Sequence, residues 1–200
     1  MLVGIVGKAR AGKDTFALML AESLFRSTSK KYVLMAFAHE LKLRVQSDFD
    51  LSYEQLWGDE KEKNDLRYAK RLEGFSSNPA DYWCSREILQ SYGEFYRTID
   101  YDFWVKKLFE VIDDREYKDV IITDVRYINE ADYIVKRGGI LIKVVRDSNN
   151  VSVRGQNHIS ETALDNYNDI EFTIENDGDL NKLKEKSDKT VKTLIDRQNK

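Results

Sequence analysis

The sequence predicts an α/β fold with a mostly parallel, five-stranded sheet flanked by helices. Two observations support this prediction. Short apolar segments alternate along the chain with segments whose apolar residues recur every three or four positions, and such alternation of strands and helices builds a parallel sheet. The first apolar segment, 2–6, runs through a glycine-bounded loop into a helical pattern at 16–24. The chain is therefore expected to begin with a strand, a tight loop and a helix.

The remaining elements follow from the same patterns. Five apolar segments are the expected strands: 2–6, 32–37, 120–123, 140–145 and 170–174. Helical spacing predicts helices at 16–24, from 40, from 85, at 102–112, at 129–136 and at 180–195. Ser85 is a candidate N-cap of the third of these helices. The stretch 47–79 is polar and highly charged without β periodicity, so we expect helices and loops there.

Length and composition limit the class of protein. A chain of 200 residues with 42% hydrophobic residues is expected to form a single domain, 1–200. Its 32 basic and 35 acidic residues nearly cancel, which predicts no stable binding to nucleic acid or to a membrane surface. A single cysteine, Cys84, and no signal peptide favour a cytoplasmic protein. The oligomeric state is open, and a homodimer is compatible with the sequence.

The loop after the first strand has the spacing of a phosphate-binding loop. It reads Gly7-x-x-x-x-Gly12-Lys13-Asp14-Thr15, between the first strand and the first helix. In such a P-loop the glycines let backbone N–H groups point at phosphate oxygens, the helix adds its positive end, and the lysine reaches the β- and γ-phosphates. The sequence thus predicts binding of a nucleoside triphosphate, with Lys13 as the central cation.

The residue after Lys13 departs from the usual motif. Asp14 stands where a Mg²⁺-binding Ser or Thr is common, and the hydroxyl follows one position later as Thr15. Asp14 is a candidate Mg²⁺ ligand, directly or through water, since hard cations accept carboxylate oxygens. Alternatively it interacts only with the positive end of the helix. The Gly-Lys-x-Thr order also favours phosphoryl transfer over a regulatory switch.

Cations beyond Lys13 suggest a second anionic substrate. Lys8 and Arg10 lie inside the loop, and further candidates are Arg71, Arg97, Arg126, Arg146 and Arg154. Many arginines form only solvated surface pairs. Arg126 follows the third strand, however, and ligands of open α/β sheets bind at the carboxyl ends of strands. Asp124 beside it is a candidate to hold Mg²⁺ through water, or else pairs with Arg126 or caps a turn.

Several segments, taken in order, resemble the deoxynucleoside monophosphate kinases of tailed bacteriophages. The matching elements are Gly7 to Thr15, Arg86-Glu87-Ile88-Leu89-Gln90 with Gly93 and Arg97, Trp104-Val105, Thr123-Asp124-Val125-Arg126 with Asn129-Glu130, Gly138-Gly139, Arg146, and His158-x-Ser160-Glu161. They extend over most of the chain. The resemblance implies a P-loop kinase fold with a helical acceptor-binding region at about 47–112 and a lid-like loop at about 146–161.

The resemblance also implies roles for individual residues. ATP would be bound by Ala11, Gly12, Lys13, Asp14, Thr15, Arg146, Asn176 and Gly178, and Mg²⁺ by Asp14, Thr15 and Asp124. The acceptor monophosphate would be bound by Lys8, Phe37, Ala38, Arg71, Gln90, Arg97 and Arg126. Of these, Lys13, Arg97 and Arg126 would be catalytic. Packing of a helix against the sheet is the alternative role for Gln90 and the expected role of Trp104. His158 and Glu161 resemble the family's histidine-serine-glutamate element, but we assign them no catalytic role, because a histidine in a polar loop is usually just solvated.

The expected reaction is in-line transfer of the γ-phosphoryl group of ATP, with Mg²⁺, to a deoxynucleoside 5′-monophosphate. The acceptor oxygen is already anionic, so no general base is needed. Two alternatives stay open. One is a P-loop kinase of another phosphorylated metabolite, similar to phosphomevalonate kinases, and the other is an ATPase or switch module.

Overall fold

The computed structural model describes residues 1–69, 82–146 and 158–198. These residues form two compact units. The first contains Met1–Phe37 and the described residues from Val105 onward, and the second contains residues 38–69 and 82–104. Arg71, Arg154 and most of the expected lid-like loop lie outside the described residues.

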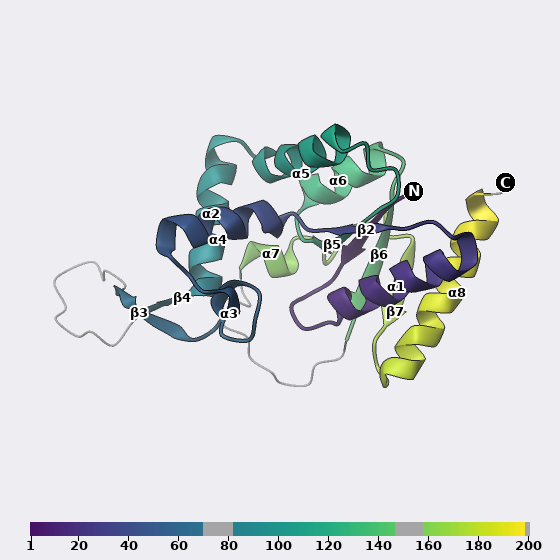
Figure 1. The fold of residues 1–200 in the computed structure, drawn as a ribbon, viewed down its shortest axis with the longest axis horizontal. Helices are drawn as coiled ribbons and strands as arrows, with labels where there is room; N and C mark the ends of the chain where they lie inside the picture. Colours follow the sequence, from purple (N-terminus) through teal and green to yellow (C-terminus); the bar gives the residue numbers. More distant parts are fainter. Residues whose placement is uncertain (70–81, 147–157, 199–200) are drawn as a thin grey trace. The chain divides into compact units, whose positions relative to one another are not determined.

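The first unit is a five-stranded sheet with helices on both faces (Figure 1). Its strands are β1 (Leu2–Val6), β2 (Val33–Met35), β5 (Val120–Val125), β6 (Ile140–Val145) and β7 (Phe172–Glu175), in the order β2-β5-β1-β6-β7. Every neighbouring pair is parallel. The predicted fold class is therefore confirmed, and β1 and β6 match their predicted bounds.

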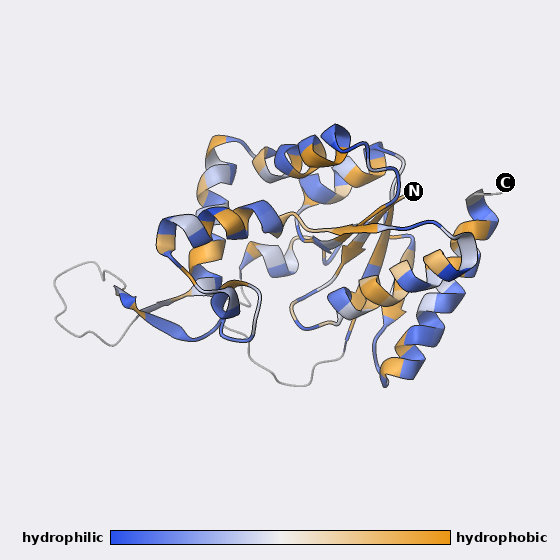
Figure 2. Ribbon diagram, viewed as in Figure 1, coloured by the Kyte–Doolittle hydropathy of each residue, from blue (hydrophilic) through white to orange (hydrophobic). Residues whose placement is uncertain are grey.

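The sheet is covered by helices whose apolar residues meet its two faces. α1 (Lys13–Thr28) packs beside α8 (Leu180–Gln198) on one face, where alternate strand residues such as Val3, Ile5 and Ile121 are buried. On the other face lie α5 (Phe103–Asp114) and α6 (Ile128–Lys136), against Val6, Ile122 and Leu141. The strands are almost wholly hydrophobic, and the helices are hydrophobic along one side only (Figure 2). Burial on both faces explains why these strands read as continuous apolar segments.

The second unit has its own core. It consists of α2 (Ala38–Phe49), α3 (Tyr53–Leu56), β3 (Asn64–Ala69), β4 (Tyr82–Cys84) and α4 (Ser85–Ile99). Leu41, Val45, Leu56, Ile88 and Trp104 are buried together in it. The indole N–H of Trp104 donates a hydrogen bond to the Gly93 carbonyl at 3.1 Å. Trp104 is thus a packing residue, as predicted, but it packs in the core of the second unit and not between a helix and the five-stranded sheet.

Two predictions for this unit are wrong. Residues 64–69 and 82–84 form an antiparallel two-stranded sheet where no strand was expected. The buried position of β3 is Asp65, which accepts hydrogen bonds from Arg67 and Gln55, so the strand has no apolar alternation to detect. Ser85 does not cap α4, because Cys84 is the N-cap residue. The Ser85 hydroxyl instead donates to the carbonyls of Gln55 and Lys61.

Strand β5 is longer than predicted. It continues to Val125, so Asp124 lies inside the strand and Arg126 follows it directly. The described part of the lid-like segment contains a short helix, α7 (Ile159–Thr162), with His158 as its N-cap. Within the described ranges, no helix is both long enough and apolar enough to span a membrane.

Candidate active site

The phosphate loop, residues 7–12, connects β1 to α1 at the carboxyl end of the sheet. Its backbone needs glycine at both ends. A Cβ atom on Gly7 would lie 2.4 Å from the Val144 carbonyl oxygen, and one on Gly12, whose φ is +92°, would lie 2.3 Å from the Asn176 side-chain nitrogen. Neither contact is sterically possible, so the two glycines of the motif are fixed by close packing as well as by backbone conformation.

Lys13, the first residue of α1, is turned back under this loop. Its ammonium donates a hydrogen bond to the Lys8 carbonyl at 2.8 Å, and the residue is only 7% exposed. Burial lowers the pKa of Lys13 to about 8, with a further lowering by the charge of Arg126, while Glu161, Asp14 and Asp124 act in the opposite direction. The loop therefore contains a desolvated cation, which interacts strongly with an arriving phosphate.

Arg126 is held at the point where β5 turns into α6. The backbone N–H groups of Arg126 and Tyr127 donate to the Glu130 carboxylate at 2.8 and 3.1 Å. Glu130 is buried, and it fixes the turn as the N3 member of a capping box. The backbone of Arg126 is thereby fixed at the carboxyl end of the sheet.

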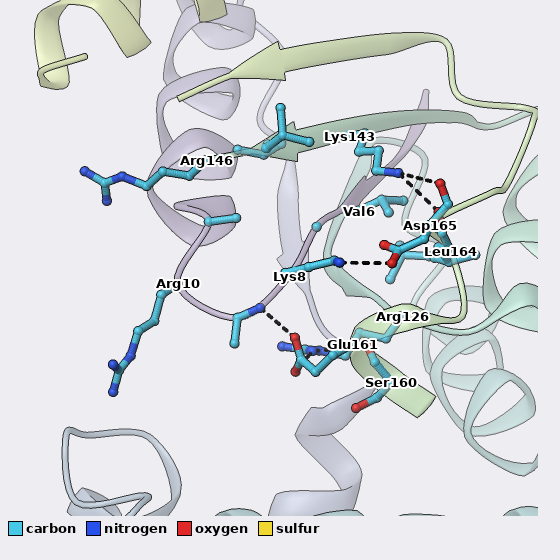
Figure 3. A pocket seen from close by; sticks show the side chains of 16 residues that line it. Val6, Lys8, Arg10, Arg126, Lys143, Arg146, Ser160, Glu161, Leu164 and Asp165 are labelled. Atoms are coloured by element: carbon cyan, nitrogen blue, oxygen red, sulfur yellow. Dashed lines mark hydrogen bonds and ion pairs between the residues drawn. The ribbon is translucent and has the colours of Figure 1, made fainter. Parts of the chain in front are cut away.

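Two acidic side chains from residues 158–165, called here the α7 segment, contact the start of the loop. The Glu161 carboxylate accepts a hydrogen bond from the Ala9 N–H at 2.7 Å and forms an ion pair with Arg126 (Figure 3). Asp165 forms an ion pair with Lys8 at 2.9 Å. The first pair is largely buried, with the Glu161 side chain 6% exposed, whereas the second is open to solvent.

These groups line a cavity of about 320 Å³. Backbone of residues 6–11 forms one side, and the ends of β5 and β6 with the α7 segment form the others. Lys143 extends from β6 to the Leu164 and Asp165 carbonyls at 3.3 and 3.2 Å (Figure 3). The side chains of Arg10 and Arg146 also border the cavity and point away from this cluster. The cavity is lined by five cations, Lys8, Arg10, Arg126, Lys143 and Arg146, and two carboxylates, Glu161 and Asp165.

A second cavity, of about 300 Å³, lies at the other end of the loop. It is lined by Gly12, Thr15, Arg146, Asn176, Gly178, Asp179, Leu180 and Leu183. The buried Asn176 side chain donates to the Ala11 carbonyl at 2.9 Å, and its backbone N–H donates to the Val145 carbonyl at 2.7 Å. Asn176 thus supports the phosphate loop in addition to bordering this cavity. Arg146 lines both cavities.

The three predicted metal ligands are all oxygen donors of the first unit. Asp14 is exposed in the first turn of α1, next to Thr15. Asp124 accepts a hydrogen bond from the Phe37 N–H at 2.7 Å. Among the described residues no group of three or more His, Cys, Asp or Glu side chains could enclose a metal. This donor set fits Mg²⁺, which is usually held by one or two carboxylates, waters and substrate phosphates rather than by a cage of side chains.

The predicted acceptor-binding residues are distributed between the two units. Lys8, Phe37 and Arg126 belong to the first, while Ala38, Gln90 and Arg97 belong to the second. Phe37 is buried and its ring packs 6.3 Å from that of Phe109, so its side chain is part of the core. Gln90 and Arg97 lie on α4, and the Arg97 guanidinium is 3.9 Å from the Glu94 carboxylate.

The sequence predicts no role in the reaction for three residues of the cavity, Glu161, Lys143 and Asp165. The His-x-Ser-Glu motif pointed to Glu161, whose contact with the loop depends on the tertiary structure. Lys143 was detectable as the one charged residue of the apolar segment 140–145. Asp165 had no signal, because an aspartate in a polar stretch is ordinarily solvated.

Comparison with known proteins gives the family. The sequence model of the family described as deoxynucleotide monophosphate kinase matches residues 27–187. A protein of Acanthamoeba polyphaga mimivirus, whose assigned name proposes a deoxynucleotide monophosphate kinase, is 27% identical over 186 residues, covering 88% of each chain. In fold, the chain is similar to dephospho-CoA kinase from Campylobacter jejuni, with a TM-score of 0.51, 14% identity and coverage of 100% of this chain and 98% of that one. The family match extends over most of the chain, which therefore belongs to the deoxynucleotide monophosphate kinase family.

Proposed function

We propose that this protein transfers the γ-phosphoryl group of ATP to the 5′-phosphate of a deoxynucleoside monophosphate, giving the diphosphate and ADP. One observation carries the proposal. A phosphate loop with a buried lysine borders a cavity that also receives Lys8 and Arg126, so one cluster of cations can face two phosphate-bearing substrates. Family membership supports phosphoryl transfer between nucleotides as the use of that cluster.

ATP would be bound along the loop. The N–H groups of residues 11–15, at the start of the 16-residue helix α1, suit the triphosphate, and Lys13 suits its β- and γ-phosphates. The cavity bordered by Asn176 and Gly178 is the proposed place for the nucleoside. Arg146, which borders both cavities, would then lie beside the triphosphate.

The acceptor phosphate would lie in the larger cavity. Lys8 and Arg126 supply positive charge there, and Arg126 offers the planar, multidentate donor geometry that matches a phosphate. Gln90 and Arg97 of α4, with Ala38, are the proposed contributions of the second unit to acceptor binding.

Mg²⁺ would be held by Asp14, Thr15 and Asp124, directly or through water, together with the phosphates. When bound, it neutralises charge on the β- and γ-phosphoryl oxygens. The protein itself orients the two substrates in line and stabilises the transferring group with Lys13 and Arg126. Cys84 is buried at the start of α4 as its N-cap residue, which makes it unsuited to nucleophilic attack.

The test is ADP formation from ATP and Mg²⁺ with each deoxynucleoside monophosphate, with each ribonucleoside monophosphate, with phosphomevalonate, and without acceptor. We expect ADP and a deoxynucleoside diphosphate to form in equal amounts, and little ADP without acceptor. Turnover with phosphomevalonate alone would assign the chain to another metabolite. Hydrolysis that is indifferent to every acceptor would identify an ATPase or switch instead.

A further inference from the structure

The guanidinium of Arg126 is held by the α7 segment. Its Nη1 atom forms an ion pair with the Glu161 carboxylate and donates to the Ser160 carbonyl at 3.4 Å. The other oxygen of the same carboxylate accepts the Ala9 N–H of the phosphate loop at 2.7 Å. One buried carboxylate therefore joins a strand-end arginine to the backbone of the loop.

We propose that Glu161 is a positioning residue that sets the Arg126 guanidinium against the phosphate loop for phosphoryl transfer. This inference rests on the proposed function. Glu161 acts on the reaction through Arg126, and it does not itself contact the transferring group.

The donors of Arg126 indicate that Glu161 positions this side chain and does not merely neutralise its charge. A guanidinium carries five N–H donors, and both contacts to the α7 segment use Nη1, so other donors remain for phosphate oxygens. The turn at Glu130 fixes only the backbone of Arg126. The long side chain needs a further contact to hold one rotamer, and a bond to a buried carboxylate supplies it.

Glu161 also differs from the neighbouring acid, Asp165. The Asp165–Lys8 pair is exposed, with side chains 40% and 60% accessible, and it makes no bond to the loop backbone. Exposed pairs of this kind fix geometry weakly. Glu161 is buried and binds two donors, so it is the acid that can transmit its position to Arg126.

To bind both Arg126 and the Ala9 N–H, the side chain at position 161 must offer two acceptor oxygens. Glu161→Gln keeps the size of the side chain but leaves only one acceptor oxygen, so its NH₂ group must face either Arg126 or the Ala9 N–H. Glu161→Asp keeps both oxygens on a side chain that is one methylene shorter. Glutamine should therefore disturb the guanidinium more than aspartate does.

The experiment is a double-mutant cycle on steady-state transfer from ATP to the preferred acceptor. We expect Glu161→Gln to lower kcat by about 30-fold, with KM for ATP changed less than threefold, and Glu161→Asp to retain more activity. In an Arg126→Ala background, Glu161→Gln should change kcat less than twofold, because the group it positions is gone. An equal fall in both backgrounds, or an unchanged kcat for Glu161→Gln, overturns the proposal.

The matched control is Asp113→Asn, which neutralises an acid paired with Arg137 at 2.7 Å on the surface between α5 and α6. It should leave kcat unchanged. Thermal unfolding of each variant separates loss of structure from loss of positioning. If Glu161→Gln does not fold, the cycle is run with Glu161→Asp, whose smaller effect on kcat must likewise disappear in the Arg126→Ala background.

A second measurement does not need transfer. Loss of the bond to a carboxylate should shift the backbone amide proton resonance of Ala9 upfield in Glu161→Gln and broaden the side-chain signal of Arg126. Because the glutamine amide can keep either partner, a change in neither the Ala9 amide nor the Arg126 side-chain signal overturns the proposal. If the wild-type protein transfers phosphate to no acceptor, the proposed function fails, and these resonances still decide whether Glu161 holds Arg126 and the loop.

Discussion

The start and the end of the phosphate loop are fixed by opposite kinds of contact. At the start, Lys8 and the Ala9 N–H are bound by the carboxylates of Asp165 and Glu161. At the end, the neutral, buried side chain of Asn176 donates to the Ala11 carbonyl. Its nitrogen also lies 2.3 Å from the position that a Cβ atom on Gly12 would take.

This difference determines which contacts of the loop a bound phosphate can replace. An amide donor on a carbonyl does not compete with a phosphate, so we expect the end of the loop to keep its shape when ATP binds. A carboxylate on a lysine does compete, since both it and phosphate are anions. The exposed Asp165–Lys8 pair is the contact that an arriving acceptor phosphate can most readily replace.

The largest expected effect is for Lys13, the buried cation that directly follows the loop and donates to the Lys8 carbonyl. Lys13→Ala should lower kcat about 1,000-fold, because the charge that acts on the transferring phosphoryl group is lost. The melting temperature should not fall, since a desolvated ammonium is removed from the fold. Steady-state kinetics and circular dichroism check both expectations. Retained activity would mean that this loop is not the phosphate site, and the comparison of its ends would lose its functional meaning.

Next in size is Arg126, which belongs to the charged start. Arg126→Ala is expected to lower kcat about 100-fold. Arg126→Lys should restore only part of this loss, because an ammonium lacks bidentate geometry. Transfer rates at saturating substrates measure both. Unchanged kinetics in Arg126→Ala would make the arginine a structural partner of Glu161 only.

A pH series tests the buried cation directly. In the protein without ATP, the pKa of Lys13 is lowered to about 8. The affinity for ATP should therefore be constant below pH 8 and fall about tenfold per pH unit above it. In Lys13→Arg the affinity should stay flat, because arginine does not deprotonate in this range. Equilibrium binding of ATP at constant ionic strength checks this, and a flat wild-type profile would contradict it.

The same shift has a consequence for stability with a defined sign. The folded protein binds fewer protons at Lys13 than the unfolded chain between pH 8 and the ordinary lysine value of 10.5. The contribution of Lys13 to the free energy of unfolding therefore increases as pH rises through this window. Denaturant unfolding of wild type and Lys13→Ala at pH 7.5 and 9.5 isolates it.

The smallest effects compare the two ends themselves. Asn176→Ala should lower the free energy of unfolding by about 2 kcal/mol, because a buried carbonyl loses its donor. Asp165→Asn should lower it by less than about 0.5 kcal/mol, as is usual for an exposed pair. Urea unfolding with a common slope measures both. Equal losses of unfolding free energy in the two variants would contradict the view that the Asn176 contact is firm and the Asp165 contact is replaceable.

Much of the fold could be predicted from the sequence, because the patterns that indicate its strands and helices are local. The strands 2–6 and 140–145 are buried on both faces, so every position is apolar apart from Gly4 and Lys143. The antiparallel pair β3–β4 was missed since its buried position is Asp65, stabilised by Arg67 and Gln55. The pKa of Asp65 lies well below its usual value, chiefly because of the hydrogen bond from Arg67. A buried aspartate that is bound by an exposed arginine has no counterpart in hydrophobic periodicity.

The phosphate loop and the five parallel strands follow from the sequence alone, because each depends on residues that are neighbours in the chain. Only the tertiary structure decided what holds the loop. Glu161 lies 152 residues from Ala9, and Asn176 lies 165 residues from Ala11. Glu161 lies in the short helix α7 and Asn176 directly follows β7, and no periodic pattern indicates a partner for either. Their contacts arise when the parallel strands bring their carboxyl ends to one edge of the sheet.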